Sequence, residues 1–338
     1  MTNPLLQVEE LCVHFSVRSG WLGRRVGTIR AVDQLSLSIE RGRTLGLVGE
    51  SGCGKSTTAR AILRLVPAAS GRIVLDGTDL RQLRGRALRR ARRHMQMIFQ
   101  DPYASLDPRM AVLDLVAEPL LAHGLGRPRA RLAERVAELC ERVGLNPAQH
   151  LGRYPHELSG GQRQRVGIAR ALALGPKLVV ADEPVSALDV SIRAQIVNLL
   201  GRLQQELGVA YLFIAHDLGV VRHMAHEVAV MYFGRIVERA PTEELFLRPT
   251  HPYTQALLGA IPVADPEIER SRPWMVLAGE PPDPRRPPAG CAFHGRCPHV
   301  FERCRSERPE LEERRAGHLA ACHLSEPPPF ALRPEART

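Results

Sequence analysis

A glycine-rich segment that ends in lysine and serine is the part of the sequence best suited to chemistry. Residues 49–56 read Gly-Glu-Ser-Gly-Cys-Gly-Lys-Ser, after the apolar run 44–48 and before a helical pattern over 55–65. Backbone N–H groups in such a loop can surround phosphate groups, aided by the helix N-terminus. Lys55 would reach the β- and γ-phosphates, and the Ser56 hydroxyl would bind Mg²⁺. The other residues predicted to line this nucleotide site are Gly49, Ser51, Gly52, Cys53, Gly54 and Thr57, although the thiol of Cys53 has no evident role.

Two adjacent acids follow a second apolar strand. The run 178–181 is apolar and leads directly into Asp182 and Glu183. Asp182 would hold the Mg²⁺ shell, and Glu183 could polarise an attacking water molecule. Acids at a strand end also serve as helix N-caps, so the pair gains its significance from the glycine-rich loop upstream. Together the two segments predict hydrolysis of a nucleotide.

Further motifs follow in an order that resembles one branch of these enzymes. Leu158-Ser159-Gly160-Gly161-Gln162 precedes a helix expected to begin near Arg163, and Gln100, Asp189 and His216 complete the set. This arrangement closely resembles an ATP-binding-cassette (ABC) ATPase. The resemblance implies that two chains enclose two ATP molecules, with the Ser159, Gly160, Gly161 and Gln162 turn contacting the γ-phosphate bound to the partner.

The resemblance also assigns roles to single residues. Gln100 is expected to sense Mg²⁺ and the transmembrane subunit, Asp189 to lie in the D-loop, and His216 to be the switch histidine. An aromatic residue from the first strand region usually stacks on adenine, and Phe15 occupies that place. Phe15 could equally be a core residue, and Tyr103 is the less favoured substitute.

Segments around and beyond the cassette resemble one subfamily. The signature motif, Leu158–Gln162, is preceded by Tyr154-Pro155-His156-Glu157. A C-terminal extension opens with His251-Pro252-Tyr253-Thr254, and a cysteine-rich tail closes the chain. These features resemble the ATPase subunits of bacterial dipeptide/oligopeptide importers. The long first hairpin, which contains Gly20-Trp21-Leu22-Gly23, is similar to that of the second of two paralogous ATPases.

This resemblance implies the partners and the location. The partners would be the paralogous ATPase, two transmembrane permease subunits and, through the permeases, an extracytoplasmic peptide-binding protein. The chain would then lie at the cytoplasmic face of the bacterial inner membrane. Importers of nickel or other solutes use similar ATPases and remain an alternative.

Four of the seven cysteines gather near the C-terminus, at Cys291, Cys297, Cys304 and Cys322. In a reducing cytosol such a group favours metal ligation over disulfides. Four thiolates suit a [4Fe–4S] cluster or a tetrahedral zinc ion. The wide spacing, the absence of a CxxC pair and the subfamily resemblance favour the cluster, with zinc as the alternative. We expect the proline-rich tail to be ordered only when its metal is bound.

Alternating strands and helices predict an α/β fold. The expected architecture is a P-loop (RecA-like) ABC ATPase core with an antiparallel β subdomain, a helical subdomain and a small cysteine-rich extension. We place the nucleotide-binding domain at residues 1–245, with its helical subdomain at about 103–160. The extension covers 246–338 and its cysteine site 291–322.

Composition narrows the function further. The longest apolar run spans 209–215, far short of the roughly 20 residues of a membrane span, and no signal peptide is evident. The net charge of +10 suits several anionic partners. Aromatic residues make up only 4% of the chain, too few for many base-stacking platforms, so we expect no nucleic-acid partner.

The sequence disfavours two functions outside transport. A non-transport ABC ATPase acting on DNA or ribosomes would carry long inserts or a second cassette, and this chain has neither. A binding module that senses ATP without hydrolysing it would not need Glu183 and His216.

Overall fold

The computed structural model describes residues 3–19, 24–261 and 279–330, which divide into two compact units. The first unit contains residues 3–7, 38–44 and 73–215. The second contains residues 8–19, 24–37, 45–72, 216–261 and 279–330. The hairpin residues Gly20, Trp21, Leu22 and Gly23 lie outside the described residues. The assignment to the second of two paralogous ATPases therefore stays a prediction.

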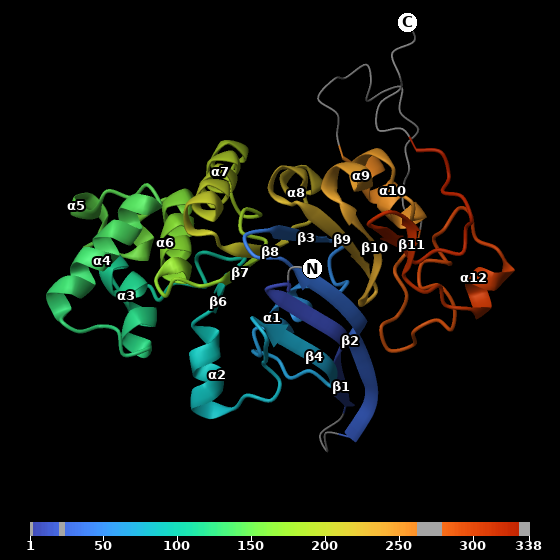
Figure 1. Ribbon diagram of the computed structural model, residues 1–338, viewed down its shortest axis with the longest axis horizontal. Coiled ribbons are helices and arrows are strands. Elements are labelled where there is room, and N and C mark those ends of the chain that lie inside the picture. Colours follow the sequence, from blue (N-terminus) through green and yellow to red (C-terminus); the bar gives the residue numbers. More distant parts are fainter. Residues whose placement is uncertain (1–2, 20–23, 262–278, 331–338) are drawn as a thin grey trace, which may run out of the picture. The chain divides into compact units, whose positions relative to one another are not determined.

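Parallel strands form the centre of the first unit (Figure 1). β7 (Leu178–Asp182) lies between β6 (Met95–Ile98) and β8 (Ala210–Ile214), and both pairings are parallel. Every residue of β7 and β8 is buried. Continuous apolar runs are typical of parallel strands that are covered on both faces. The carboxyl end of β7 thus carries Asp182 to the edge of a rigid sheet.

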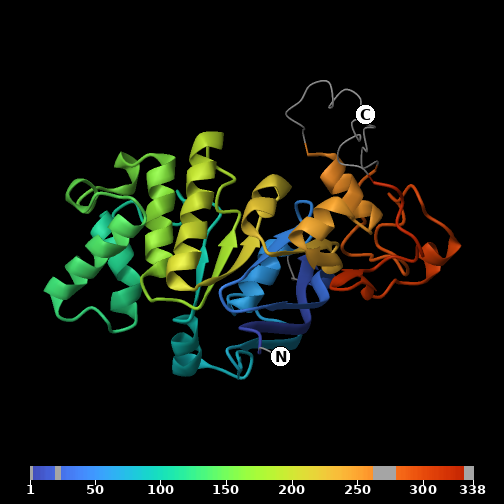
Figure 2. The ribbon, with the colours of Figure 1, turned by 45° about the horizontal axis from the view of Figure 1, so that its top comes forward.

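Four helices of the first unit pack against one another: α3 (Val112–Ala122), α4 (Arg129–Arg142), α6 (Gly160–Leu172) and α7 (Val190–Leu207). In Figure 2, α6 and α7 run side by side as the green and yellow helices. The short α5 (Pro147–His150) and the 3₁₀ turn η1 (Pro155–Glu157) connect α4 to α6. α3 continues through Pro119, and Leu115, Val116 and Leu120 are buried along it.

The remaining elements of the first unit are small. α2 (Gly85–Arg92) has no buried residue, so its arginines form a solvated face. β5 (Thr78–Asp79) pairs with the end of β4 (Ser70–Leu75), with Val74 opposite Asp79. Of these elements, β4 contributes Ile73 and Leu75 to the core, whereas α2 contributes nothing.

The second unit contains a mixed sheet in the order β3, β9, β10, β12, β11. β3 (Thr44–Val48) is parallel to β9 (Glu227–Tyr232), and β9 is antiparallel to β10 (Arg235–Pro241). β12 (His318–Ala320) and β11 (Glu312–Arg315) come from the C-terminal extension. Glu238 of β10 stands opposite Ala320 of β12. The extension is therefore part of the sheet that supports the glycine-rich loop.

The second unit also contains strands of a second sheet and several helices. β1 (Leu6–Ser19) lies between β2 (Arg24–Ile39) and β4. The helices are α1 (Lys55–Ile62), α8 (Leu218–Met224), α9 (Thr242–Leu247), α10 (Pro252–Gly259) and α12 (Glu302–Ser306). α9 contacts both β9 and β10, as Figure 1 shows in yellow and orange.

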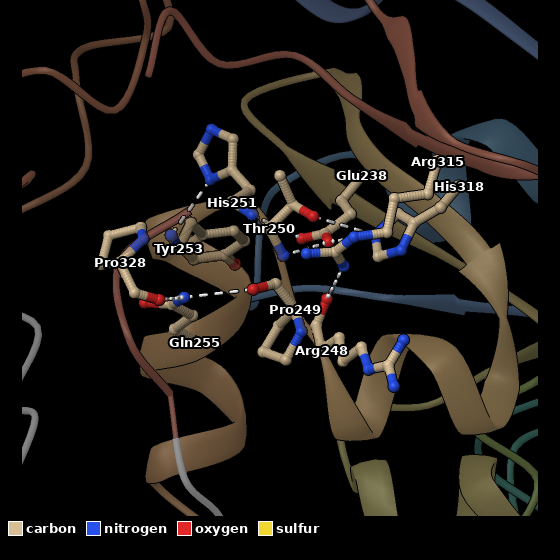
Figure 3. A network of polar contacts seen from close by, with 10 residues as sticks. All are labelled: Glu238, Arg248, Pro249, Thr250, His251, Tyr253, Gln255, Arg315, His318 and Pro328. Atoms are coloured by element: carbon tan, nitrogen blue, oxygen red, sulfur yellow. Dashed lines mark hydrogen bonds and ion pairs between the residues drawn. The ribbon is translucent and has the colours of Figure 1, made fainter. Parts of the chain in front are cut away.

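A buried carboxylate on β10 connects the His-Pro-Tyr-Thr segment to β12, which lies further along the extension (Figure 3). Glu238 is fully buried and accepts hydrogen bonds from the backbone N–H groups of Thr250 (2.6 Å) and His251 (2.9 Å). Nε2 of His318, in β12, lies 2.6 Å from Oε1 of Glu238. Nδ1 of His251 accepts a hydrogen bond from the backbone N–H of Tyr253 at 3.0 Å. Burial lowers the pKa of His251 to about 4, so its ring is neutral at pH 7.

We expect Glu238→Ala to lower the free energy of unfolding of this unit by about 3–5 kcal/mol, because it leaves buried amides and His318 without their acceptor. The measurement is urea unfolding followed by circular dichroism. Glu243→Ala is the matched control, since Glu243 pairs with Arg222 at the surface. The control should leave the transition unchanged. Equal shifts for both variants would contradict a special role of the buried carboxylate.

Candidate active site

The glycine-rich loop, residues 49–56, joins β3 to α1 in the second unit. Gly49 has a φ of 151°, and a Cβ there would lie 2.1 Å from the carbonyl oxygen of Met231. Gly54 has a φ of 111°, and its Cβ would lie 2.2 Å from the carbonyl oxygen of Ala31. Both positions therefore exclude side chains. A Cβ on Gly52 would meet no atom within 4 Å, so the chain leaves open space at that point of the loop.

Lys55 is held over the loop by main-chain carbonyl groups. Its side chain is 5% exposed, and Nζ donates hydrogen bonds to the carbonyl oxygens of Gly49 (2.7 Å) and Glu50 (2.8 Å). Nζ also lies 3.8 Å from Sγ of Cys53. Burial raises the pKa of the Cys53 thiol, although Lys55 partly opposes the shift. The thiol therefore stays protonated at neutral pH and offers no thiolate for chemistry.

The composition of this loop fits a magnesium nucleotide. Two glycines admit close approach of the backbone, a buried ammonium group faces the main chain of the loop, and Ser56 supplies an oxygen ligand one residue further on. Mg²⁺ prefers oxygen ligands such as hydroxyl and carboxylate groups. Ser56 in the second unit and Asp182 in the first are ligands of this kind.

The two acids of the first unit have different environments. Asp182, the last residue of β7, is 1% exposed. Glu183 is more accessible and has a φ of 47°, which is uncommon for a residue other than glycine. Its backbone N–H donates to the carbonyl oxygen of Ile214 at 2.9 Å, so β8 holds this conformation. Strained residues of this kind gather at functional sites.

Gln100 lies next to Glu183. Nε2 of Gln100 donates a hydrogen bond to Oε2 of Glu183 at 2.9 Å. The two residues are 83 positions apart in the sequence and follow the neighbouring strands β6 and β7. The structure thus brings together two of the three residues predicted to be catalytic. The third, His216, is exposed. It comes just after β8 in the sequence but belongs to the second unit.

The signature turn caps α6. Ser159 is the N-cap residue, and its Oγ accepts from the backbone N–H of Gln162 at 3.3 Å. Oε1 of Gln162 accepts in return from the backbone N–H of Ser159 at 2.9 Å, which completes a capping box. The helix begins at Gly160, three residues before the expected start near Arg163. A Cβ on Gly161 would lie 2.7 Å from the side chain of Ile192, so α6 and α7 require a glycine there.

The other predicted ligand residues are accessible. Phe15 on β1 is 41% exposed, which suits a stacking surface better than a core position. Asp189 is exposed at the N-terminus of α7, and Ser51 and Ser159 are also exposed. Tyr103 contacts the guanidinium group of Arg163, whose carbon atom lies 3.8 Å from the ring centroid. The roles of these residues stay predictions.

The sequence did not reveal the residues that support the loop from the extension. Both Nη atoms of Arg296 contact the carboxylate of Glu50, and the Tyr253 hydroxyl contacts the backbone N–H of Glu50. Tyr253 belongs to the His-Pro-Tyr-Thr segment, which was noticed only as a subfamily feature. Arg296 is one of many arginines, and no local pattern distinguishes it.

Known families match the two parts of this sequence. A family described as "ABC transporter" matches residues 32–186, and one described as "Oligopeptide/dipeptide transporter, C-terminal region" matches residues 237–304. The probable peptide ABC transporter ATP-binding protein y4tS of Sinorhizobium fredii is 52% identical, covering 97% of this chain and 92% of its own. The oligopeptide transport ATP-binding protein AppF of Bacillus subtilis is 50% identical, covering 95% of this chain and 98% of its own.

Solved structures share the fold. The ATP-binding cassette MJ0796, solved as a dimer in a post-hydrolysis state with ADP and Pi, matches with a TM-score of 0.61 and 27% identity. The match covers 70% of this chain and 98% of that one. CbiO1 from Clostridium perfringens, part of the ABC transporter complex cbiONQ, has a TM-score of 0.61 and 29% identity, covering 72% and 91% of the two chains.

These matches define an ABC ATPase, an enzyme that binds and hydrolyses ATP. The chain belongs to the family of peptide and oligopeptide transport ATP-binding proteins, at about 50% identity over nearly its whole length. The predicted fold of the cassette, the ATP ligand and the subfamily are thereby confirmed. Among the described residues, no helix has both the length and the apolar character that crossing a membrane requires.

The prediction of a [4Fe–4S] cluster at Cys291, Cys297, Cys304 and Cys322 was wrong. The relatives that match the chain over its cysteine-rich tail are ATP-binding proteins by name, and no comparison supports a cluster. Contacts within the protein, rather than a metal, order the tail. Phe293 is instead 1% exposed within an aromatic cluster, β12 pairs with β10, and Arg296 forms an ion pair with Glu50.

The zinc alternative stays a prediction, and all four cysteines line one small cavity. Within the described ranges, no three of these cysteines have sulfur atoms within 4.8 Å of one another. Zinc–sulfur bonds of about 2.3 Å would bring tetrahedral sulfur ligands closer than that. The one group that meets this distance among the described residues is Cys12, His14 and Asp33, and Asp33 forms ion pairs with Arg235 and Arg308.

Gly49→Ala tests the geometry of the loop. We expect it to abolish ATP binding, because the new Cβ would collide with the carbonyl oxygen of Met231. Gly77→Ala is the matched control. Gly77 also has a positive φ, 78°, but a Cβ there would meet nothing within 4 Å, so the control should lose only about 1–2 kcal/mol of stability. Calorimetric titration with ATP checks both, and normal affinity of the Gly49 variant would contradict the close approach.

Proposed function

We propose that this chain is the ATP-hydrolysing subunit of a peptide importer at the cytoplasmic face of the bacterial cell membrane. Its partners would be a paralogous ATPase and two permease subunits, which receive peptide from an extracytoplasmic binding protein. The observation that carries the proposal is the hydrogen bond between Gln100 and Glu183 beside the buried Asp182. Identity to peptide-transport proteins extends through the C-terminal region and supports the substrate class.

The glycine-rich loop would bind the phosphates. Lys55 would exchange the carbonyl oxygens of Gly49 and Glu50 for phosphate oxygens, which keeps its ammonium group paired throughout. Ser56, Asp182 and Gln100 would hold Mg²⁺. When bound, Mg²⁺ neutralises charge on the phosphate oxygens. Phe15 would stack on adenine through its exposed ring.

Glu183 would act as the general base. Its carboxylate would orient and polarise water, and the hydrogen bond from Gln100 fixes the direction of that carboxylate. Gln100 lies in an accessible segment beside two exposed aromatic side chains, Phe99 (41%) and Tyr103 (63%). Such a surface suits contact with a permease. Docking of the permease would then affect Glu183 through its hydrogen bond with Gln100.

A second chain would complete each site. The Ser159–Gln162 turn is capped internally, and the exposed Ser159 lies at the N-terminal end of α6. A helix N-terminus attracts phosphate. This turn would bind the γ-phosphate on the partner, with Asp189 at the interface and His216 following the state of the γ-phosphate. Closure of two chains around ATP would then drive the permeases.

Glu183→Gln tests the catalytic assignment. The variant should bind ATP normally and lose nearly all turnover in the assembled transporter, because the amide cannot accept a proton from water. Lys55→Ala should instead lose ATP affinity, because the phosphates lose a positive charge. The measurements are phosphate release and ATP binding. Turnover of Glu183→Gln at the wild-type rate would show that another group is the base.

The second test concerns assembly. The isolated chain should hydrolyse ATP slowly, with a rate per chain that rises with concentration, since each site needs the Ser159–Gln162 turn of another chain. Addition of the paralogous ATPase and both permeases should increase the rate. A full rate that does not depend on concentration would contradict the two-chain site.

A further inference from the structure

Glu50 places an acidic side chain at the second position of the phosphate loop. It is the only carboxylate in residues 49–56, and it follows Gly49, whose backbone must approach the ligand closely. The phosphate chain of ATP carries several negative charges. An unpaired carboxylate in the same loop would repel them over a few ångströms, where solvent screening is weak. The loop therefore needs a counter-charge for Glu50.

Arg296 of the C-terminal extension supplies that charge. Its Nη1 and Nη2 atoms donate to Oε2 and Oε1 of Glu50 at 2.7 and 2.9 Å, which is a bidentate ion pair. The Arg296 side chain is only 7% exposed, whereas that of Glu50 is 28% exposed. The hydrogen bond to Glu50 raises the pKa of Arg296 above its ordinary value, so the guanidinium stays charged.

Tyr253 holds the main chain of the same residue. Its hydroxyl oxygen accepts a hydrogen bond from the backbone N–H of Glu50 at 2.8 Å. Tyr253 is fully buried, and burial raises the pKa of its hydroxyl far above neutral pH. Two residues from beyond the cassette thus contact Glu50, one at its side chain and one at its backbone.

An aromatic cluster makes these contacts rigid. The Phe293 ring centroid lies 5.4 Å from those of Tyr232 and Tyr253 and 5.8 Å from that of His251. The backbone N–H of Arg296 donates to the carbonyl oxygen of Phe293 at 2.9 Å, so the buried ring anchors the turn that carries Arg296. The guanidinium is therefore positioned before any nucleotide arrives.

We propose that Arg296 and Tyr253 are positioning residues for ATP, through which the C-terminal extension sets the nucleotide affinity of the phosphate loop. Arg296 neutralises Glu50, and Tyr253 fixes its backbone. The inference rests on the proposed phosphate site at residues 49–56. Because the effect is electrostatic, it depends on the charge of the ligand: it is largest for ATP, smaller for ADP and absent for adenosine.

Calorimetric titration of the full chain with ATP, ADP and adenosine tests the proposal. Arg296→Ala should weaken ATP binding about 3- to 30-fold, the range expected for one uncompensated charge several ångströms from the phosphates. The loss should be smaller for ADP, absent for adenosine and reduced at high salt. Arg303→Ala is the matched control, because Arg303 forms a bidentate pair with Glu307 on the same extension but at the surface. The control should bind all three ligands normally.

The double variant Glu50→Gln/Arg296→Ala separates charge from packing. Removal of both charges should restore ATP affinity to within about twofold of wild type, although the arginine is still missing. An equal loss for adenosine, or a double variant no better than Arg296→Ala, would overturn the proposal. Lys55→Ala separates this result from failure of the site itself. If Lys55→Ala also bound ATP normally, the assignment of residues 49–56 would fall, and the role of Arg296 with it.

Discussion

Close approach of the backbone at Gly49 is the constraint on which the rest of the second unit depends. The carbonyl oxygen of Met231 would lie 2.1 Å from a Cβ at this position, so β9 must run directly behind the loop. The loop is also tied to the β9–β10 turn, since the backbone N–H of Gly234 donates to the carbonyl oxygen of Cys53 at 2.9 Å. A phosphate-binding loop has few side chains of its own with which to pack. Its shape is therefore imposed by the strands around it.

The extension continues the same support. β12 adds to β10, and the buried Glu238 fixes the start of the His-Pro-Tyr-Thr segment, which in turn carries Tyr253 to Glu50. A carboxylate without exposure is costly unless its oxygens are paired, and here two amides and His318 pair them. A specific polar network and one aromatic cluster thus order a proline-rich segment that has little apolar surface to bury. The small apolar surface that this segment buries does not by itself predict that the segment is ordered.

The sequence predicted those parts of the site that are local in the chain. The loop, the strand before Asp182 and the turn at Ser159 each follow from short patterns, and β3 has the predicted bounds. Distant pairs were harder. The resemblance placed Gln100 in the site but did not predict its hydrogen bond to Glu183. The pair between Arg296 and Glu50 spans 246 positions without a periodic signal. The spacing of the cysteines suggested a bound metal. The contacts that hold the tail come instead from Phe293 and Arg296, which lie between the first two of these cysteines in the sequence.

At Glu183, a fixed direction of the carboxylate is kept at the expense of backbone stability. A residue other than glycine at positive φ costs about 1–3 kcal/mol, and a glycine would relieve it. The strain persists because β8 holds the backbone of Glu183 through Ile214 while Gln100 holds its carboxylate. A base must face water in one direction, and a relaxed side chain would sample several. In the second unit, the position of Glu50 is fixed by Arg296 and Tyr253, which lie far from it in the sequence. In both places, neighbouring residues fix the position of a residue that would lie beside the bound nucleotide.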